Sequence, residues 1–280
     1  MKKFIAIFII LFPLYVLSQP IKLGNLNGYY STQETISDSI IILLHGTRGH
    51  QNLEIISSLR EMLKENSLDS LSINLSYGIT NRNNDFLPCD IKHKHTVSDT
   101  LNEIQVWYNY IKKIGYKNIY LLGHSRGGQD ITNFYQGLNE KDQALVNAVF
   151  LLAPISDSSL DNVEHYKKEF NIDITSIINN DKVKIDFLGC KDASVFGYSF
   201  KSYYYNLNIS NIIDVLRVTK GKFYIITGSE DTITPYTHER VQQSIKNKKD
   251  IELYKIDGAG HFFRDFYFDD LSEIILDKLN

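Results

Sequence analysis

A serine between two glycines, in the stretch YLLGHSRGGQD, is the first candidate for chemistry in this sequence. Residues 117–122 are apolar enough to predict a short buried strand, and residues 129–138 have the spacing of a helix. Such a sharp turn holds its central residue in an unusual backbone conformation, and Gly123 and Gly127 leave room for the strand and the helix to approach. The G-x-S-x-G pattern therefore predicts that Ser125 is a nucleophile at a strand-to-helix turn.

Polar groups also follow three other predicted strands. The motif HGTRGH follows the apolar run at residues 39–44. GSED places Asp231 just after residues 223–227, and DGAGH places His261 after residues 251–256. The carboxyl ends of parallel strands share one edge of a sheet, so these groups should meet there. A serine, an acid and a histidine at one edge could act as nucleophile, orienting group and general base.

Strands and helices alternate along the chain after a polar start at residues 19–38. Further strands are expected at residues 71–75 and 148–152, and further helices at residues 53–65, 97–114, 238–245 and 266–279. This alternation predicts an α/β fold with a mainly parallel sheet flanked by helices. Residues 157–220 interrupt it, and we expect them to form a cap insertion, with two or three short helices, over the carboxyl edge of the sheet.

The four motifs, in this order and spacing, resemble those of the α/β-hydrolase superfamily. The resemblance covers residues 39–280 and implies a catalytic triad of Ser125, Asp231 and His261. It implies an oxyanion hole formed by the backbone amides of Thr47 and Arg126. His45 is then expected to shape the loop that carries Thr47. Asp157 is an alternative triad acid, because the family uses both positions, but GSED favours Asp231.

The predicted function is an exported serine hydrolase that acts on an ester, as a carboxylesterase does, through an acyl-enzyme. Peptide or amide cleavage on the same triad, or a binding protein on a hydrolase scaffold, are the alternatives. The motifs require no cofactor and no metal. Arg48 and Arg126 could contact an acidic group of the substrate, although an ion pair or exposure to solvent would explain each equally well.

Composition and charge exclude other classes of protein. Hydrophobic residues make up 43% of the chain and charged residues 22%, with a formal net charge of −3, so nucleic acid is not the expected partner. Residues 1–18 have two lysines followed by an apolar run, the layout of a secretory signal peptide. We expect cleavage to leave residues 19–280 as a secreted or periplasmic hydrolase domain without membrane insertion, and a small-molecule ester as its partner. The oligomeric state stays open.

Two cysteines and two histidines complete the set of candidates. Export favours a bond between Cys89 and Cys190, which would tie the cap to the core, but two free thiols remain possible from the sequence. His93 and His95 alternate in KHKH and could share one face, yet without a nearby carboxylate a solvated loop is favoured over a metal site. The aromatic residues at 196–205 should mostly pack the cap, with one or two lining a pocket for small to medium uncharged esters.

Overall fold

The structure is a computed structural model of the 280-residue chain, and it describes residues 18–32, 37–207, 209–246 and 248–279. Except for Ser18, the predicted signal peptide lies outside the described residues. Within these ranges, no helix combines the length and the apolar character that a membrane crossing requires.

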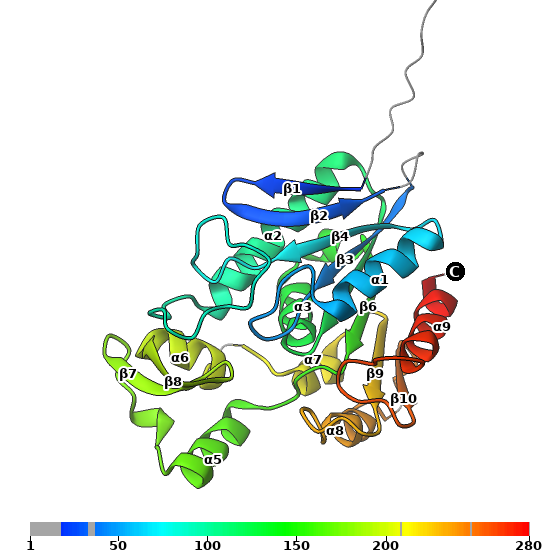
Figure 1. The fold of residues 1–280 in the computed structure, drawn as a ribbon. Coiled ribbons are helices and arrows are strands. Elements are labelled where there is room, and N and C mark those ends of the chain that lie inside the picture. The colour runs from blue at the N-terminus through cyan, green and yellow to red at the C-terminus, as the bar shows by residue number, and fades with distance from the viewer. Residues whose placement is uncertain (1–17, 33–36, 208, 247, 280) are drawn as a thin grey trace, which may run out of the picture.

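One sheet of eight strands, all within the described residues, lies at the centre of the fold in the order β1-β2-β4-β3-β5-β6-β9-β10 (Figure 1). The strands are β1 (Gln19–Leu23), β2 (Leu26–Ser31), β3 (Ser39–Leu44), β4 (Asp69–Asn74), β5 (Asn118–His124), β6 (Val146–Leu152), β9 (Phe223–Gly228) and β10 (Ile251–Ile256). From β4 to β10 all neighbours are parallel, while β1 and β2 are antiparallel additions at one edge. The mainly parallel sheet confirms the predicted fold class.

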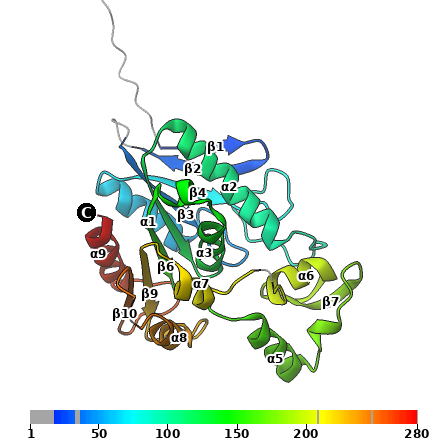
Figure 2. The ribbon, with the colours of Figure 1, turned by 180° about the vertical axis from the view of Figure 1, so that it is seen from behind.

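Helices cover both faces of this sheet. They are α1 (Glu54–Glu65), α2 (Val97–Ile114), α3 (Arg126–Gly137), α4 (Glu140–Gln143), α8 (Thr237–Ser244) and α9 (Tyr267–Leu279). Helices α2, α3 and α8 pack on one face, and α1 and α9 pack on the other (Figures 1 and 2). This layering matches the alternation that the sequence predicts.

Strand β3 shows why its sequence is a continuous apolar run. Ile40, Ile42 and Leu44 belong to the hydrophobic cluster on one face, whereas Ile41 and Leu43 belong to the cluster on the other. All five side chains are buried. A strand covered by helices on both sides has no solvated face, so it carries no alternating polar residues.

The edge strands β1 and β2 lie in the polar start at residues 19–38, for which no strand was predicted. Every residue of β1 is exposed or only half-buried, so its sequence carries no strong hydrophobic pattern. Its backbone is held instead by pairing with β2, which in turn pairs with β4. Edge strands of this kind depend on a neighbour that is distant in sequence, and the local pattern does not reveal them.

The chain between β6 and β9 forms a separate lobe and then returns to the core (Figure 1). It contains α5 (Ser159–Phe170), the short 3-10 helix η1 (Ile174–Ser176), β7 (Lys182–Phe187), β8 (Cys190–Phe196), α6 (Gly197–Tyr204) and α7 (Ile212–Val218). Strands β7 and β8 pair as an antiparallel hairpin, where only short helices were expected. Helix α7 packs against α3 and α8.

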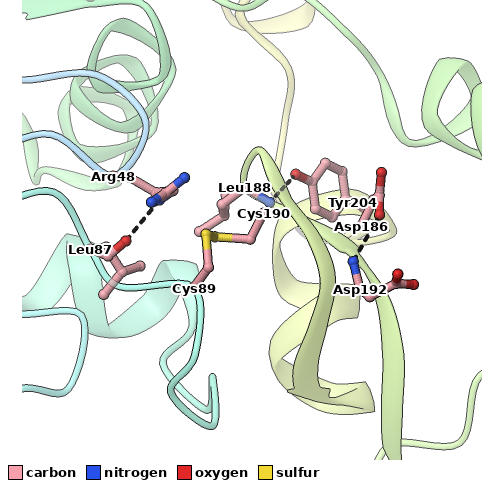
Figure 3. The surroundings of a disulfide bond; sticks show 8 residues. All are labelled: Arg48, Leu87, Cys89, Asp186, Leu188, Cys190, Asp192 and Tyr204. Atoms are coloured by element: carbon pink, nitrogen blue, oxygen red, sulfur yellow. Dashed lines mark hydrogen bonds between the residues drawn. A yellow bond between two sulfur atoms is a disulfide. The ribbon is translucent and has the colours of Figure 1, made fainter.

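A disulfide joins this lobe to the core, the arrangement predicted for Cys89 and Cys190 (Figure 3). Cys89 and Cys190 are bonded with their Cα atoms 5.4 Å apart, across a sequence separation of 101 residues. Nearby, the backbone N–H of His93 donates to the carbonyl oxygen of Ser194 at 2.9 Å, which adds a backbone contact between the same two segments. The loop before α2 and strand β8 are therefore fastened by both covalent and hydrogen bonds.

Replacing both Cys89 and Cys190 with serine should lower the free energy of unfolding by about 2–5 kcal/mol. The bond closes a loop across 101 residues, and its loss restores that conformational freedom to the unfolded chain. Urea unfolding of the oxidised wild type and the double variant measures the difference. Thiol titration of the unreduced, denatured wild type should detect no free thiol. An equal free energy of unfolding in the two proteins would contradict the prediction.

Candidate active site

Ser125 lies at the turn between β5 and α3, in a backbone conformation with φ 55° and ψ −122°. Such a conformation costs a non-glycine residue about 1–3 kcal/mol and persists only where the surroundings hold it. Here the N–H of Ser125 donates to the carbonyl oxygen of Leu152 at 2.8 Å, and its own carbonyl oxygen accepts from the N–H of Ile155 at 3.3 Å. Helix α3 begins directly after the serine, at Arg126, rather than at residue 129.

The two glycines that flank this turn have no room for a side chain. A Cβ on Gly123 would lie 2.3 Å from the carbonyl oxygen of Gly127, and a Cβ on Gly127 would lie 2.4 Å from that of His45. These are backbone atoms that cannot move aside. The close approach of strand and helix confirms the reason given for the glycines of the G-x-S-x-G pattern.

Asp231 and His261 form a buried hydrogen-bonded pair. Nδ1 of His261 lies 2.9 Å from Oδ2 of Asp231, and both side chains are nearly inaccessible to solvent. The carboxylate also accepts hydrogen bonds from the N–H of Ile233 at 2.8 Å and from the hydroxyl of Thr234 at 2.6 Å. In the neutral tautomer whose Nδ1–H donates to this carboxylate, Nε2 carries no proton and can act as a base.

The hydrogen bonds keep Asp231 ionised. Burial by itself would raise the pKa of its carboxyl group, but the hydrogen bonds from His261 and Thr234 outweigh burial and hold the pKa below its usual range. A carboxylate that stays charged can orient the imidazole and stabilise its protonated form.

The competing acid, Asp157, has a different partner. Its carboxylate lies 2.9 Å from the guanidinium of Arg240, and its side chain is about half exposed. Of the two acids that the sequence left in competition, the structure brings Asp231 to His261.

His124, which the sequence analysis did not single out, supports the histidine of the pair. Its ring lies 4.8 Å from the ring of His261, and its Nε2–H donates to the backbone carbonyl oxygen of His261 at 2.9 Å. Because His124 directly precedes Ser125, this contact links the serine turn to the loop that carries His261. The sequence signal that could have identified His124 is its position inside the G-x-S-x-G pattern, directly before the serine.

The loop after β3 runs alongside the serine turn. A Cβ on Gly46 would lie 3.0 Å from the Cβ of Ser125, a tight contact that shows how close the two segments are. Thr47 follows in this loop. Nδ1 of His45 donates to the carbonyl oxygen of Gly46 at 2.9 Å, and Nε2 accepts from the N–H of Leu75 at 3.3 Å. His45 thus holds the shape of the loop, the role expected for it.

Two backbone amides are available next to the serine. Arg126 is the first residue of α3, and the first N–H groups of a helix have no partner within the helix. Thr47 is half-buried in the adjacent loop. Amides in these positions, with the positive end of a helix beside them, could stabilise a negative oxygen that forms on an atom bound to Ser125.

His93 and His95 do not lie in a solvated loop, so that expectation is wrong. Both are buried, and Nδ1 of His95 lies 3.0 Å from the hydroxyl of Tyr203. The rings of both histidines pack against Phe187. The lobe covers this segment, which the spacing KHKH cannot reveal. In the part of the chain that the structure describes, no cluster of three or more His, Cys, Asp or Glu side chains could hold a metal ion.

Stability should fall as the pH drops from 6.5 to about 4.5. Burial lowers the pKa of His45, His95 and His124 from 6.5 to about 3. In this pH window these three side chains therefore bind protons in the unfolded chain but stay neutral in the folded chain. Burial raises the pKa of Asp130 and Glu103, which offsets part of this uptake. A net uptake of one or two protons corresponds to about 1–3 kcal/mol per pH unit. Urea unfolding at pH 7 and pH 5 checks this, and greater stability at pH 5 would contradict it.

Residues 96–187 match a family described as a protein of unknown function, DUF1749. This stretch runs from the residue that caps α2, through the serine turn, to the end of β7. A search of curated protein sequences returned no match.

Solved structures with a similar fold cover nearly the whole chain. Est1E from Butyrivibrio proteoclasticus aligns with a TM-score of 0.66 at 18% identity, covering 94% of this chain and 98% of its own. An esterase from Pyrococcus furiosus gives 0.63 at 15% identity, with coverages of 94% and 90%. An alpha-beta serine hydrolase homologue from Coxiella burnetii gives 0.58 at 15% identity, with coverages of 94% and 97%.

Proposed function

Because this chain has the α/β-hydrolase fold, we propose that it is an exported serine hydrolase that cleaves small carboxylic esters through an acyl-enzyme. The observation that supports this most is the buried pair of His261 and Asp231, whose imidazole packs against the residue before Ser125. A base oriented in this way beside a serine turn is the arrangement that activates a hydroxyl.

In the proposed reaction, the hydroxyl oxygen of Ser125 attacks the ester carbonyl carbon while Nε2 of His261 takes the hydroxyl proton. Asp231 stabilises the imidazolium that forms. The amides of Thr47 and Arg126 donate to the carbonyl oxygen as it becomes negatively charged. His261 then gives the proton to the departing alcohol, and a water molecule deprotonated by the same ring releases the acid from Ser125.

The similar structures support an ester as the substrate. The protein from Pyrococcus furiosus is an esterase, and Est1E has been solved with ferulic acid bound. Neither fact assigns a substrate to this chain, because the fold hosts many chemistries. Aminoacyl amides therefore belong in the same test as esters.

Export is part of the proposal. The layout of residues 1–18 is that of a signal peptide, and the bond between Cys89 and Cys190 is of the kind that persists in oxidising compartments. We place residues 19–280 as the mature protein in the periplasm or outside the cell. Fractionation of cells that express the full chain, followed by N-terminal sequencing of the product, tests this placement.

A fluorophosphonate probe tests the serine chemistry directly. Only an activated serine reacts with it, so the native protein should be labelled on Ser125 and the heat-denatured protein should not. Screening esters of graded acyl length beside aminoacyl amides then identifies the reaction. Absence of labelling in the folded protein would favour a binding protein on a hydrolase scaffold, and faster cleavage of the amides would favour a peptidase.

A further inference from the structure

A cavity of about 310 Å³, lined by both polar and apolar groups, lies between α3 and the lobe. Four of its lining residues share one side of α3, because they are three or four positions apart: Arg126, Gln129, Asp130 and Asn133. Tyr203 and Tyr204 of α6 also line it. The cavity is thus built from the helix that follows the serine turn and from the lobe.

The cavity reaches the immediate neighbours of the proposed nucleophile. Arg126 follows Ser125 in the chain, and Ile155, which also lines the cavity, donates its N–H to the carbonyl oxygen of Ser125 at 3.3 Å. A group bound in the cavity can therefore belong to a substrate whose ester bond lies at Ser125.

The guanidinium of Arg126 is buried but has few partners. The residue is only 7% exposed. Its Nη1 donates to Oε1 of Gln129 at a long 3.3 Å, and its buried Nε has no partner among the described residues. Its Cζ lies 5.4 Å and 5.7 Å from the ring centres of Tyr203 and Tyr204. The carboxyl group of Asp130 is close enough to interact with this cation, but no hydrogen bond joins the two side chains. A buried cation without a bonded counter-ion is costly, so donors of this side chain are open to an anion from a ligand.

Asp130 lines the same cavity and is equally unusual. It is 3% exposed, and no described residue makes a hydrogen bond to its carboxyl oxygens. Burial raises the pKa of Asp130 to about 7, although the nearby Arg126 acts to lower it. The other titratable groups that act on it are Tyr77 and Tyr203, whose own pKa values burial raises, so they stay neutral. Below pH 7 the inner end of the cavity therefore carries a net positive charge.

The charges at the outer rim are already paired. Arg240 contacts Asp157 at 2.9 Å, and Arg217 contacts Asp214 at 3.3 Å. Arg48, the other arginine considered from the sequence, donates from Nε to the carbonyl oxygen of Leu87 at 2.8 Å and holds the loop near the disulfide (Figure 3). Arg126 is therefore the arginine among these four that lines the cavity.

We propose that the cavity beside Ser125 binds a carboxylate carried by the ester substrate, with the guanidinium of Arg126 as the anion-binding group and Asp130 as its neighbour. This inference rests on the proposed function. A guanidinium presents parallel N–H donors that match the two oxygens of a carboxylate. The substrate class is then acid-bearing esters, which replaces the expectation of uncharged esters drawn from the aromatic residues of the lobe.

The kinetic test uses matched esters with and without the acid. In the first pair, the para-nitrophenyl ester of hydrogen adipate carries a carboxylate in its acyl part, and para-nitrophenyl hexanoate is its uncharged control. In the second pair, para-carboxyphenyl hexanoate carries the carboxylate in its alcohol part, and phenyl hexanoate is its uncharged control. In at least one pair, the wild type should favour the acid ester in kcat/KM. Arg126→Met, which keeps the backbone amide, should lower that preference roughly tenfold to hundredfold. Lys117→Met removes an exposed charge whose partner, Asp38, does not line the cavity, and should leave the ratio unchanged.

The pH dependence of the same ratio reports on Asp130. Since its carboxyl becomes charged as the pH rises through about 7, the preference for the acid ester should decline there in the wild type. Asp130→Asn, close in shape, should abolish this decline. Using a ratio cancels the titration of the catalytic groups, which affects both esters equally. A preference that is absent in both ester pairs, or that is equal in the wild type and Arg126→Met, would overturn the proposal.

A binding measurement separates this inference from the proposed function. Calorimetry on Ser125→Ala, which needs no turnover, should show tighter binding of monomethyl adipate than of methyl hexanoate, and Arg126→Met in that background should remove the difference. If binding behaves so while no ester is hydrolysed by the wild type, the proposed function fails and the anion site stands. If esters are hydrolysed but the two ligands bind alike, the anion site fails and the proposed function stands.

Discussion

Replacing Ser125 with alanine is expected to lower kcat for ester hydrolysis by about a millionfold, the loss seen when a serine hydrolase loses its nucleophile. Without the hydroxyl no acyl-enzyme forms, and the contacts that hold the turn do not compensate. Those contacts, from the backbone of Ser125 to Leu152 and Ile155, are independent of the hydroxyl, so the fold should persist. Steady-state rates with a chromogenic ester, over background hydrolysis, measure the effect.

Thermal unfolding is the control for this variant. Alanine and serine pay a similar penalty at φ 55°, so the two proteins should unfold at nearly the same temperature. Fluorophosphonate labelling should disappear together with turnover. Substantial hydrolysis by a variant purified free of host esterases would show that another residue is the nucleophile.

Replacing Asp231 with asparagine is expected to lower kcat by about ten-thousandfold, as the equivalent change does in a serine protease. The amide of asparagine can still bond to His261, but it cannot hold Nδ1 as the protonated nitrogen or stabilise the imidazolium. Binding of substrate should change much less than kcat. Steady-state kinetics on the same chromogenic ester separate the two parameters.

Asp157→Asn is the matched control, because it makes the same chemical change at the residue that the sequence offered as the alternative triad acid. Its partner is Arg240 and its side chain is about half exposed. Loss of such an exposed ion pair is worth about 1 kcal/mol or less, so kcat should change less than about fivefold. Equal losses in the two variants, or a larger loss for Asp157→Asn, would contradict the assignment of Asp231.

The sequence by itself was enough to predict the parallel strands of the central sheet and the turn at Ser125. The strands β3, β5 and β9 are buried on both faces, and a continuous apolar run is the direct chemical consequence of that burial. The glycines at the turn are likewise a local requirement, because a Cβ on Gly123 or Gly127 would collide with backbone atoms. The order of the motifs also placed Asp231 and His261 after strands that end at one edge.

Other features depend on neighbours that are distant along the chain, and only the tertiary structure decided them. Strand β1 exists because β2 pairs with it, not because its own residues are apolar. His93 and His95 are buried because the lobe covers them, and nothing in KHKH indicates that cover. The hairpin of β7 and β8 lacks a strong local signal for the same reason.

The tertiary structure also decided between the alternatives that the sequence left open at the site. The spacing of residues left Asp157 and Asp231 as competing acids and gave Arg126 no particular partner. Packing brings Asp231 to His261, pairs Asp157 with Arg240, and buries Arg126 against two tyrosines from the lobe. Residue type and strand position determine which chemistry is available, because they act locally. Which groups meet depends on distances between segments that the chain brings together only on folding.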